Sequence, residues 1–164
     1  MTGWIGISLG DVTGIGPEVT LKALAQEASA DETRYLVIGD VGRLAQLNEL
    51  LGIRLPFRPY AGAQAADRFC FHNPLAQALS ADLPPGSPDA ARAAVAWLRE
   101  GAERCLRGEL DALVTAPVNK EAIIRSGQRF VGQTEFLSEL AGTTRTVMML
   151  LGDDDRGHWL RVAL

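Results

Sequence analysis

Residue types that often carry catalysis or bind metal are scarce in this chain of 164 residues, which has two histidines, two cysteines and two lysines. Cys70 and Cys105 form no C-x-x-C pair, so neither a zinc knuckle nor a redox motif is present, and we expect both to be buried thiols. We expect His72 in a loop and His158 at a hairpin beside solvent. The sequence therefore assigns no metal ligand.

The chain also lacks a basic field and a long apolar run. Its formal net charge is -4 and no block of like charges stands out, which argues against nucleic acid as a partner. No apolar stretch reaches the roughly 18 residues of a membrane span, and the N-terminus has no basic region followed by a hydrophobic core. We expect a cytoplasmic protein with no membrane partner.

Hydrophobic residues make up 47% of the chain, enough for about one packed domain. Apolar runs bounded by glycine, proline and capping residues alternate with amphipathic stretches. The expected strands are residues 4–9, 35–38, one or two within 53–71, 112–115, 146–151 and 159–164; the expected helices are residues 17–27, 41–51, 88–107, 119–125 and 134–140. This order predicts the α/β class, layered α/β/α with a largely parallel sheet.

The first candidate for ligand binding is the glycine-rich loop of residues 10–18, GDVTGIGPE, between the first strand and the first helix. Glycines leave the backbone open to a ligand, and the helix that follows directs free N–H groups at that space. The loop is not a dinucleotide fingerprint, because Val19 stands where a third glycine belongs. Gly14 and Gly16 are therefore candidates for cofactor binding, while a tight turn with glycines for backbone reasons remains the alternative.

The second candidate is the segment of residues 115–120, TAPVNK, where a strand gives way to a short helix. Because the chain uses arginine fourteen times and lysine only twice, Lys120 indicates a place for a compact ammonium, although a solvated surface lysine is the alternative. Asn119 lies beside it at the carboxyl end of a strand, where open α/β sheets bind ligands. We expect Asn119 and Lys120 to face a ligand cleft.

A third segment, residues 130–137 (FVGQTEFL), places a glycine and hydrogen-bonding side chains ahead of a helix. Gln133 or Thr134 could bind a phosphate oxygen together with the helix N-terminus, or Thr134 could simply cap the helix. The three aspartates at residues 153–155 offer hard oxygen ligands, but their place between two strands and near glycines is typical of a solvated turn.

These segments, with residues 147–150 (VMML) and 160–164 (LRVAL), resemble in order and spacing the 4-hydroxythreonine-4-phosphate dehydrogenase family. The resemblance covers nearly the whole chain and implies an incomplete isocitrate/isopropylmalate dehydrogenase-like fold. It implies that NAD and a divalent metal serve to oxidise 4-phosphooxy-L-threonine, a small phosphorylated hydroxy-amino acid, whose product decarboxylates on the route to pyridoxal phosphate. It further implies a cytoplasmic homodimer with its site in a cleft between two domains.

Residue by residue, the resemblance implies substrate binding by the family's G-H-T-E motif, which reads GQTE here. Thr134 matches, whereas Gln133 replaces a histidine, and glutamine can donate a hydrogen bond but cannot carry the charge or shuttle a proton. We expect Gln133 and Thr134 to bind the substrate phosphate, with Asn119 and Lys120 as further substrate contacts. The first loop departs as well, because the family commonly has Pro-Ala where residues 12–13 are Val-Thr. No residue is assigned a catalytic role.

Members of the 4-hydroxythreonine-4-phosphate dehydrogenase family are longer than this chain, and their metal-binding histidines come from the part that would follow Leu164. Because the chain stops inside a strand pattern, we expect a partial sequence. Residues 1–128 would be an incomplete N-terminal α/β domain and residues 129–164 the start of a substrate and metal domain, so we expect the chain alone to be inactive. The alternatives are a dehydrogenase of another phosphorylated hydroxy acid and a non-catalytic remnant or binding module.

Overall fold

The computed structural model describes residues 3–29 and 32–163. The chain divides into two compact units, Met1–Phe130 and Val131–Leu164, which we call unit 1 and unit 2 and describe separately. The predicted boundary after residue 128 lies two residues before this division. That residues 129–164 belong to a substrate and metal domain stays a prediction.

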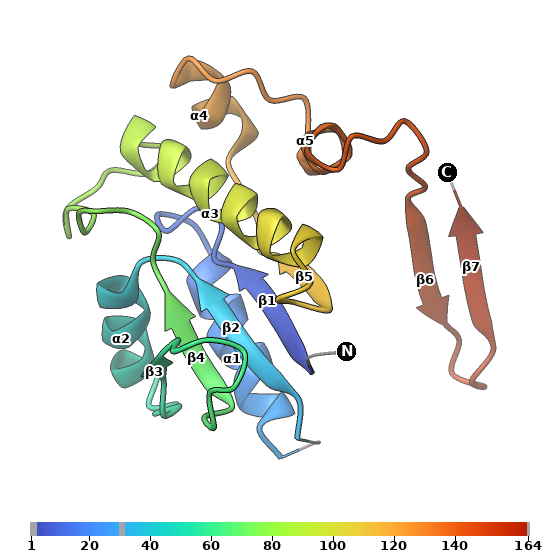
Figure 1. The fold of residues 1–164 in the computed structure, drawn as a ribbon, viewed down its shortest axis with the longest axis horizontal. Helices are drawn as coiled ribbons and strands as arrows, with labels where there is room; N and C mark the ends of the chain where they lie inside the picture. Colours follow the sequence, from blue (N-terminus) through green and yellow to red (C-terminus); the bar gives the residue numbers. More distant parts are fainter. Residues whose placement is uncertain (1–2, 30–31, 164) are drawn as a thin grey trace. The chain divides into compact units, whose positions relative to one another are not determined.

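Unit 1 is built on a five-stranded parallel sheet with the strand order β3-β4-β2-β1-β5 (Figure 1). Its elements are β1 (Trp4–Ser8), α1 (Gly16–Glu27), β2 (Arg34–Ile38), α2 (Val41–Leu50), β3 (Arg58–Pro59), β4 (Phe69–His72), α3 (Pro88–Leu106), β5 (Ala112–Thr115) and α4 (Lys120–Arg125). The predicted α/β class with a largely parallel sheet is confirmed.

Helices cover both faces of this sheet, with α3 on one face and α1 on the other (Figure 1). Strand β2 is therefore apolar on both faces, and its last four residues are all buried. On α3 the buried stripe consists mainly of alanines around Trp97, and such small side chains let the helix lie close to the strands. Among the residues described, none of the helices combines the length and the apolar composition needed to cross a bilayer.

Capping residues fix where the helices of unit 1 begin and end. Asp40 Oδ1 accepts the Arg43 N–H at 2.8 Å to start α2, and Ser87 Oγ accepts the Ala90 N–H at 3.1 Å to start α3. Gly52 and Gly108 follow the ends of these helices in the left-handed conformation, with φ of 66° and 72°. The structure confirms both predicted caps and both predicted ends.

Unit 2 contains α5 (Gln133–Leu140) and an antiparallel hairpin of β6 (Met149–Asp153) and β7 (Trp159–Ala163). The strand predicted to begin at Thr146 begins instead at Met149, because Met149 is the first residue of β6 to pair, opposite Ala163. None of residues 131–163 is buried. The exposed large apolar side chains are Val131, Val147, Met148, Met149, Leu150, Leu151, Trp159, Leu160 and Val162. Apolar side chains on both faces are typical of interior strands of larger sheets.

Two of the three aspartates at residues 153–155 lie in the turn of this hairpin. Asp153 is the last residue of β6, whereas Asp154 Oδ1 accepts the N–H groups of Arg156 at 2.9 Å and His158 at 2.8 Å. The His158 ring also lies 2.8 Å from Asp154 Oδ2, and both side chains are exposed. The predicted turn and the solvent-facing His158 are thus confirmed, and Asp153 belongs to the strand.

The prediction that His72 lies in a loop is wrong, because His72 is the last residue of β4. Its carbonyl accepts the Gly39 N–H at 3.0 Å, so the pairing of β4 continues past the end of β2 and includes the residue directly before Asn73. Burial of the ring and the positive charge of Arg104 lower the pKa of His72, although Glu100, with Oε1 3.6 Å from Nε2, acts in the opposite direction. We therefore expect a mostly neutral imidazole in the folded protein at neutral pH.

His72 should make the protein less stable in mild acid. Its pKa in the unfolded chain is about 6.5 and lower in the folded state, so the unfolded chain binds more protons as the pH falls. The free energy of unfolding should therefore be highest above about pH 6.5 and decrease below it. His72→Gln should flatten this decrease in urea unfolding measured from about pH 5 to about pH 7.5. His158→Gln is the control for loss of an exposed imidazole; an unchanged slope in His72→Gln would contradict the assignment.

Candidate ligand site at the carboxyl edge of the sheet

The loop after β1 lies directly against the segment after β5. Gly10 has a left-handed φ of 68°, and a Cβ there would collide with the carbonyl oxygens of Ala116 and Pro117. The N–H of Asp11 donates to the Pro117 carbonyl at 2.9 Å. Because β1 and β5 are parallel neighbours, this contact joins the two predicted ligand-binding segments at one edge of the sheet.

A buried carboxylate gives the first loop its shape. Asp11 is 7% exposed, and its Oδ1 accepts the Thr13 N–H at 2.9 Å and the Thr13 hydroxyl at 2.7 Å. The same hydroxyl oxygen accepts the Gly86 N–H at 3.2 Å, which ties the loop to the turn before α3. An alanine at this position could form neither side-chain bond. Thr13 is thus a structural residue that the sequence pattern did not reveal.

The two segments enclose a shallow depression of about 380 Å³. It is lined by Asp11, Gly14, Ile15, Pro117, Val118, Asn119 and Lys120. Three predicted site residues, Gly14, Asn119 and Lys120, are therefore brought together. Gly16 does not line the depression: it is buried at the start of α1, where a Cβ would lie 2.5 Å from the Leu9 carbonyl oxygen. Close packing explains this glycine, and binding of a cofactor by Gly14 or Gly16 stays a prediction.

The polar side chains at the depression differ in their hydrogen bonds and ion pairs. Asn119 Oδ1 accepts the Ala122 N–H at 3.0 Å and so caps α4, which leaves the amide nitrogen as the donor for a ligand. Lys120 is exposed, and its ammonium forms no ion pair or hydrogen bond within residues 3–29 and 32–163. The other lysine, Lys22, pairs with Glu18 at 2.5 Å. Lys120 is therefore available to an anionic ligand.

Ile15 is a site residue that motif reasoning missed. It is 64% exposed at the tip of the first loop and lines the depression with Val118. The signal in the sequence is a large apolar residue between two glycines in a loop, where a polar residue would be ordinary. A ligand in the depression would meet apolar surface from Ile15 together with the positive charge of Lys120.

In unit 2 the predicted phosphate residues lie at the start of a helix. Gly132 is the N-cap of α5, with extended backbone and no side chain to bond the first-turn N–H groups. The alternative that Thr134 caps the helix is wrong, because Gln133 and Thr134 are its first two residues. The Thr134 carbonyl accepts the Ser138 hydroxyl at 2.7 Å. At this helix end Gln133 is half-buried and Thr134 is exposed.

No metal centre is formed by the described part of the chain, where no three His, Cys, Asp or Glu side chains gather closely enough to hold an ion. Asp11, the buried carboxylate nearest the depression, already accepts two hydrogen bonds from Thr13. The divalent metal implied by the family resemblance therefore has no ligand set among these residues.

The chain is an α/β protein whose parallel sheet has a shallow depression at its carboxyl edge, the edge at which open α/β sheets bind ligands. A family model described as pyridoxal phosphate biosynthetic protein PdxA matches residues 31–164. The chain belongs to this family.

Curated relatives agree with the family match. A 4-hydroxythreonine-4-phosphate dehydrogenase of Desulfosudis oleivorans is 35% identical over 153 residues, covering 91% of this chain and 45% of that protein. A D-threonate 4-phosphate dehydrogenase of Cupriavidus necator is 38% identical over 154 residues, covering 90% of this chain and 45% of that protein. The chain thus spans about half the length of these relatives.

Solved structures show the same relation in three dimensions. A 4-hydroxythreonine-4-phosphate dehydrogenase from Burkholderia phymatum is similar with a TM-score of 0.78 and 35% identity, covering 91% of this chain and 46% of that one. One from Klebsiella pneumoniae has a TM-score of 0.81 and 29% identity, covering 98% of this chain and 49% of that one.

The contact between the two loops predicts a large cost for a methyl group at Gly10. Gly10→Ala should lower the free energy of unfolding by about 3 kcal/mol, because it adds a backbone collision to the left-handed strain of a non-glycine residue. Gly52→Ala is the matched control: it has a similar φ of 66° with no atom within 4 Å of the added Cβ, and should cost about 1 kcal/mol. Urea unfolding measures both; equal costs would contradict the close approach of the loops.

Proposed function

We propose that this chain forms part of an NAD-dependent, metal-requiring dehydrogenase that oxidises 4-phosphooxy-L-threonine, with decarboxylation of the product, in pyridoxal phosphate biosynthesis. The observation that supports this most is the match of about nine-tenths of the chain to relatives named 4-hydroxythreonine-4-phosphate dehydrogenase. Because the chain spans about half of those relatives, the activity belongs to the whole protein, a cytoplasmic homodimer. The chain alone is inactive in this proposal.

Within this proposal, two places on the chain bind the substrate. The N-terminus of α5 takes the phosphate, because its N-cap residue, Gly132, has no side chain to bond the first turn and Thr134 carries a hydroxyl donor. Gln133 adds an amide donor in place of an imidazole. In unit 1, Lys120 and the Asn119 amide offer further donors to an anionic or hydroxyl group of the substrate.

NAD and the divalent metal differ in how well the described residues fit them. NAD, when bound, accepts the hydride that leaves the substrate alcohol. Gly14 lines the depression without a side chain of its own, and the apolar side chain of Ile15 suits a flat ring, so the depression fits part of such a cofactor. The described residues do not fit a divalent metal, so no step of the reaction is assigned to a metal held by this chain.

A second candidate is oxidation of another phosphorylated hydroxy acid. It is favoured by the relative named D-threonate 4-phosphate dehydrogenase, which is 38% identical to this chain, and by Gln133 in place of the histidine in the resembling family's motif. Both substrates carry a phosphate that the N-terminus of α5 could hold. They differ at the second carbon, which bears an ammonium group in one and a hydroxyl in the other, so a comparison of the two separates the candidates.

Binding of the substrate phosphate can be measured on the chain itself. 4-Phosphooxy-L-threonine and D-threonate 4-phosphate should each shift the backbone amide NMR signals of Gln133 and Thr134. Gln133→His should tighten binding about tenfold below about pH 6, where the imidazolium adds a charge-assisted bond. Glu139→Gln, at the other end of α5, is the control and should leave that pH dependence unchanged.

The outcomes separate the proposals. Tighter binding of 4-phosphooxy-L-threonine supports the first candidate, and tighter binding of D-threonate 4-phosphate supports the second. No saturable shift at α5 with either compound would contradict a phosphate site there. Neither compound should produce NADH with this chain alone, whereas the dehydrogenase from D. oleivorans serves as the positive control; NADH formation by the chain would contradict its proposed dependence on further sequence.

A further inference from the structure

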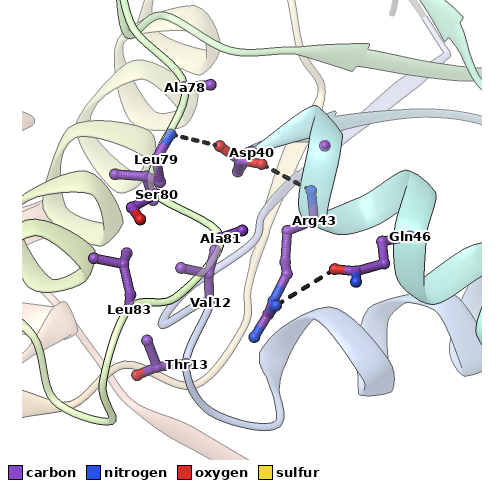
Figure 2. A pocket seen from close by; sticks show the side chains of 11 residues that line it. Val12, Thr13, Asp40, Arg43, Gln46, Ala78, Leu79, Ser80, Ala81 and Leu83 are labelled. Atoms are coloured by element: carbon purple, nitrogen blue, oxygen red, sulfur yellow. Dashed lines mark hydrogen bonds between the residues drawn. The ribbon is translucent and has the colours of Figure 1, made fainter.

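Unit 1 contains a second hollow that the proposed function does not use. It is a cavity of about 310 Å³ between the first loop, the start of α2 and the segment before α3 (Figure 2). Val12, Leu79, Ala81 and Leu83 form its apolar walls. It shares no lining residue with the depression at Lys120, and its volume is at the low end for small-molecule pockets, which run from about 300 to 1,000 Å³. The cavity is therefore a separate place for a ligand much smaller than a dinucleotide.

Asp40 holds the walls of this cavity together. Its side chain is 5% exposed, with Oδ1 accepting the Arg43 N–H at 2.8 Å and Oδ2 accepting the Leu79 N–H at 3.1 Å. These bonds join the start of α2 to the segment that carries Leu79. Because Asp40 caps α2 and both of its oxygens already accept a backbone N–H, neither the carboxylate nor the helix end is the main ligand-binding group.

The group that can bind a ligand is the guanidinium of Arg43. It forms one hydrogen bond, to Gln46 Oε1 at 3.4 Å, and no ion pair with any carboxylate in the described ranges. Figure 2 shows it directed away from Asp40, toward the space bounded by Val12 and Thr13. Arg43 is half-buried as a residue and its bond to Gln46 is exposed, so the guanidinium keeps most of its donors for a carboxylate or phosphate, whose oxygens it matches as a fork.

We propose that this cavity binds a small amphiphilic anion, a carboxylate or phosphate monoester carried on an apolar body about the size of one ring. The anionic group would bind Arg43 and Gln46, and the apolar body would lie against Val12, Leu79 and Leu83. Apolar walls with a few placed polar or charged groups, here Arg43, Gln46 and the hydrogen-bonded Asp40, are the usual composition of small-molecule sites. The site is independent of the dehydrogenase function proposed above.

Titration of the chain with four probes tests the site: phenyl phosphate, benzoate, inorganic phosphate and benzyl alcohol. Phenyl phosphate or benzoate should shift the backbone amides of Arg43, Leu79 and Ala81 to saturation, and leave the amide of Lys120 unmoved. Arg43→Gln should weaken binding about tenfold or more, because it removes a charge-assisted contact. Arg58→Gln, an exposed position on β3, is the matched control and should change binding less than about twofold.

Each outcome bears on the site. Tighter binding of phenyl phosphate assigns a phosphate ligand, and tighter binding of benzoate assigns a carboxylate. Equal binding by benzyl alcohol would overturn the need for an anion, and equal binding by inorganic phosphate would overturn the role of the apolar walls. No saturable shift, or full affinity in Arg43→Gln, would overturn the site itself. Should Arg43→Gln fail to fold by circular dichroism, Ala81→Leu, which fills the cavity without changing charge, must abolish binding.

Discussion

The close approach of Gly10 to the Pro117 carbonyl is the contact on which the candidate site depends. Only a residue without Cβ fits there, and the Asp11 N–H then donates to the same oxygen at 2.9 Å. Once this contact forms, Gly14, Asn119 and Lys120 lie around one depression. The loop that makes the contact also supplies Val12 and Thr13 to the second cavity, so both hollows at this edge of the sheet depend on it.

Much of unit 1 could be predicted because its signals are local. Buried strands are visible in the sequence as apolar runs. Asp40 and Ser87 predicted the starts of two helices, and the structure confirms both residues as N-caps. The order of the strands was not predicted, because neighbours such as β1 and β5 are more than a hundred residues apart and their pairing leaves no local pattern. The strand position of His72 was missed for the same reason. Its carbonyl pairs with Gly39, which follows β2 far earlier in the chain, whereas the residues next to it, around Asn73, indicated only a loop.

The candidate site, like the fold, has features that local sequence predicts and features that depend on contacts between distant segments. The glycine-rich loop and the segment with Lys120 were recognised as motifs, but their contact is a tertiary fact that neither segment contains alone. Gly16 belonged to a ligand-binding pattern, yet packing against the Leu9 carbonyl explains why it is glycine. The two side-chain bonds of Thr13 depend on a buried Asp11 and on Gly86, and were visible only in the structure. In unit 2, β6 and β7 expose apolar side chains on both faces. Relatives of this chain in the same family are about twice as long. The proposed activity is accordingly one of a whole protein.

Amide hydrogen exchange at Asp11 tests the central contact most directly. If the first loop is held against the segment after β5, the Asp11 N–H exchanges as slowly as the N–H groups inside β1, because Asp11 is buried and its N–H donates to the Pro117 carbonyl at 2.9 Å. An Asp11 N–H that exchanges as fast as that of the exposed Gln64 would show that the two segments do not hold one another and would contradict the account of the site.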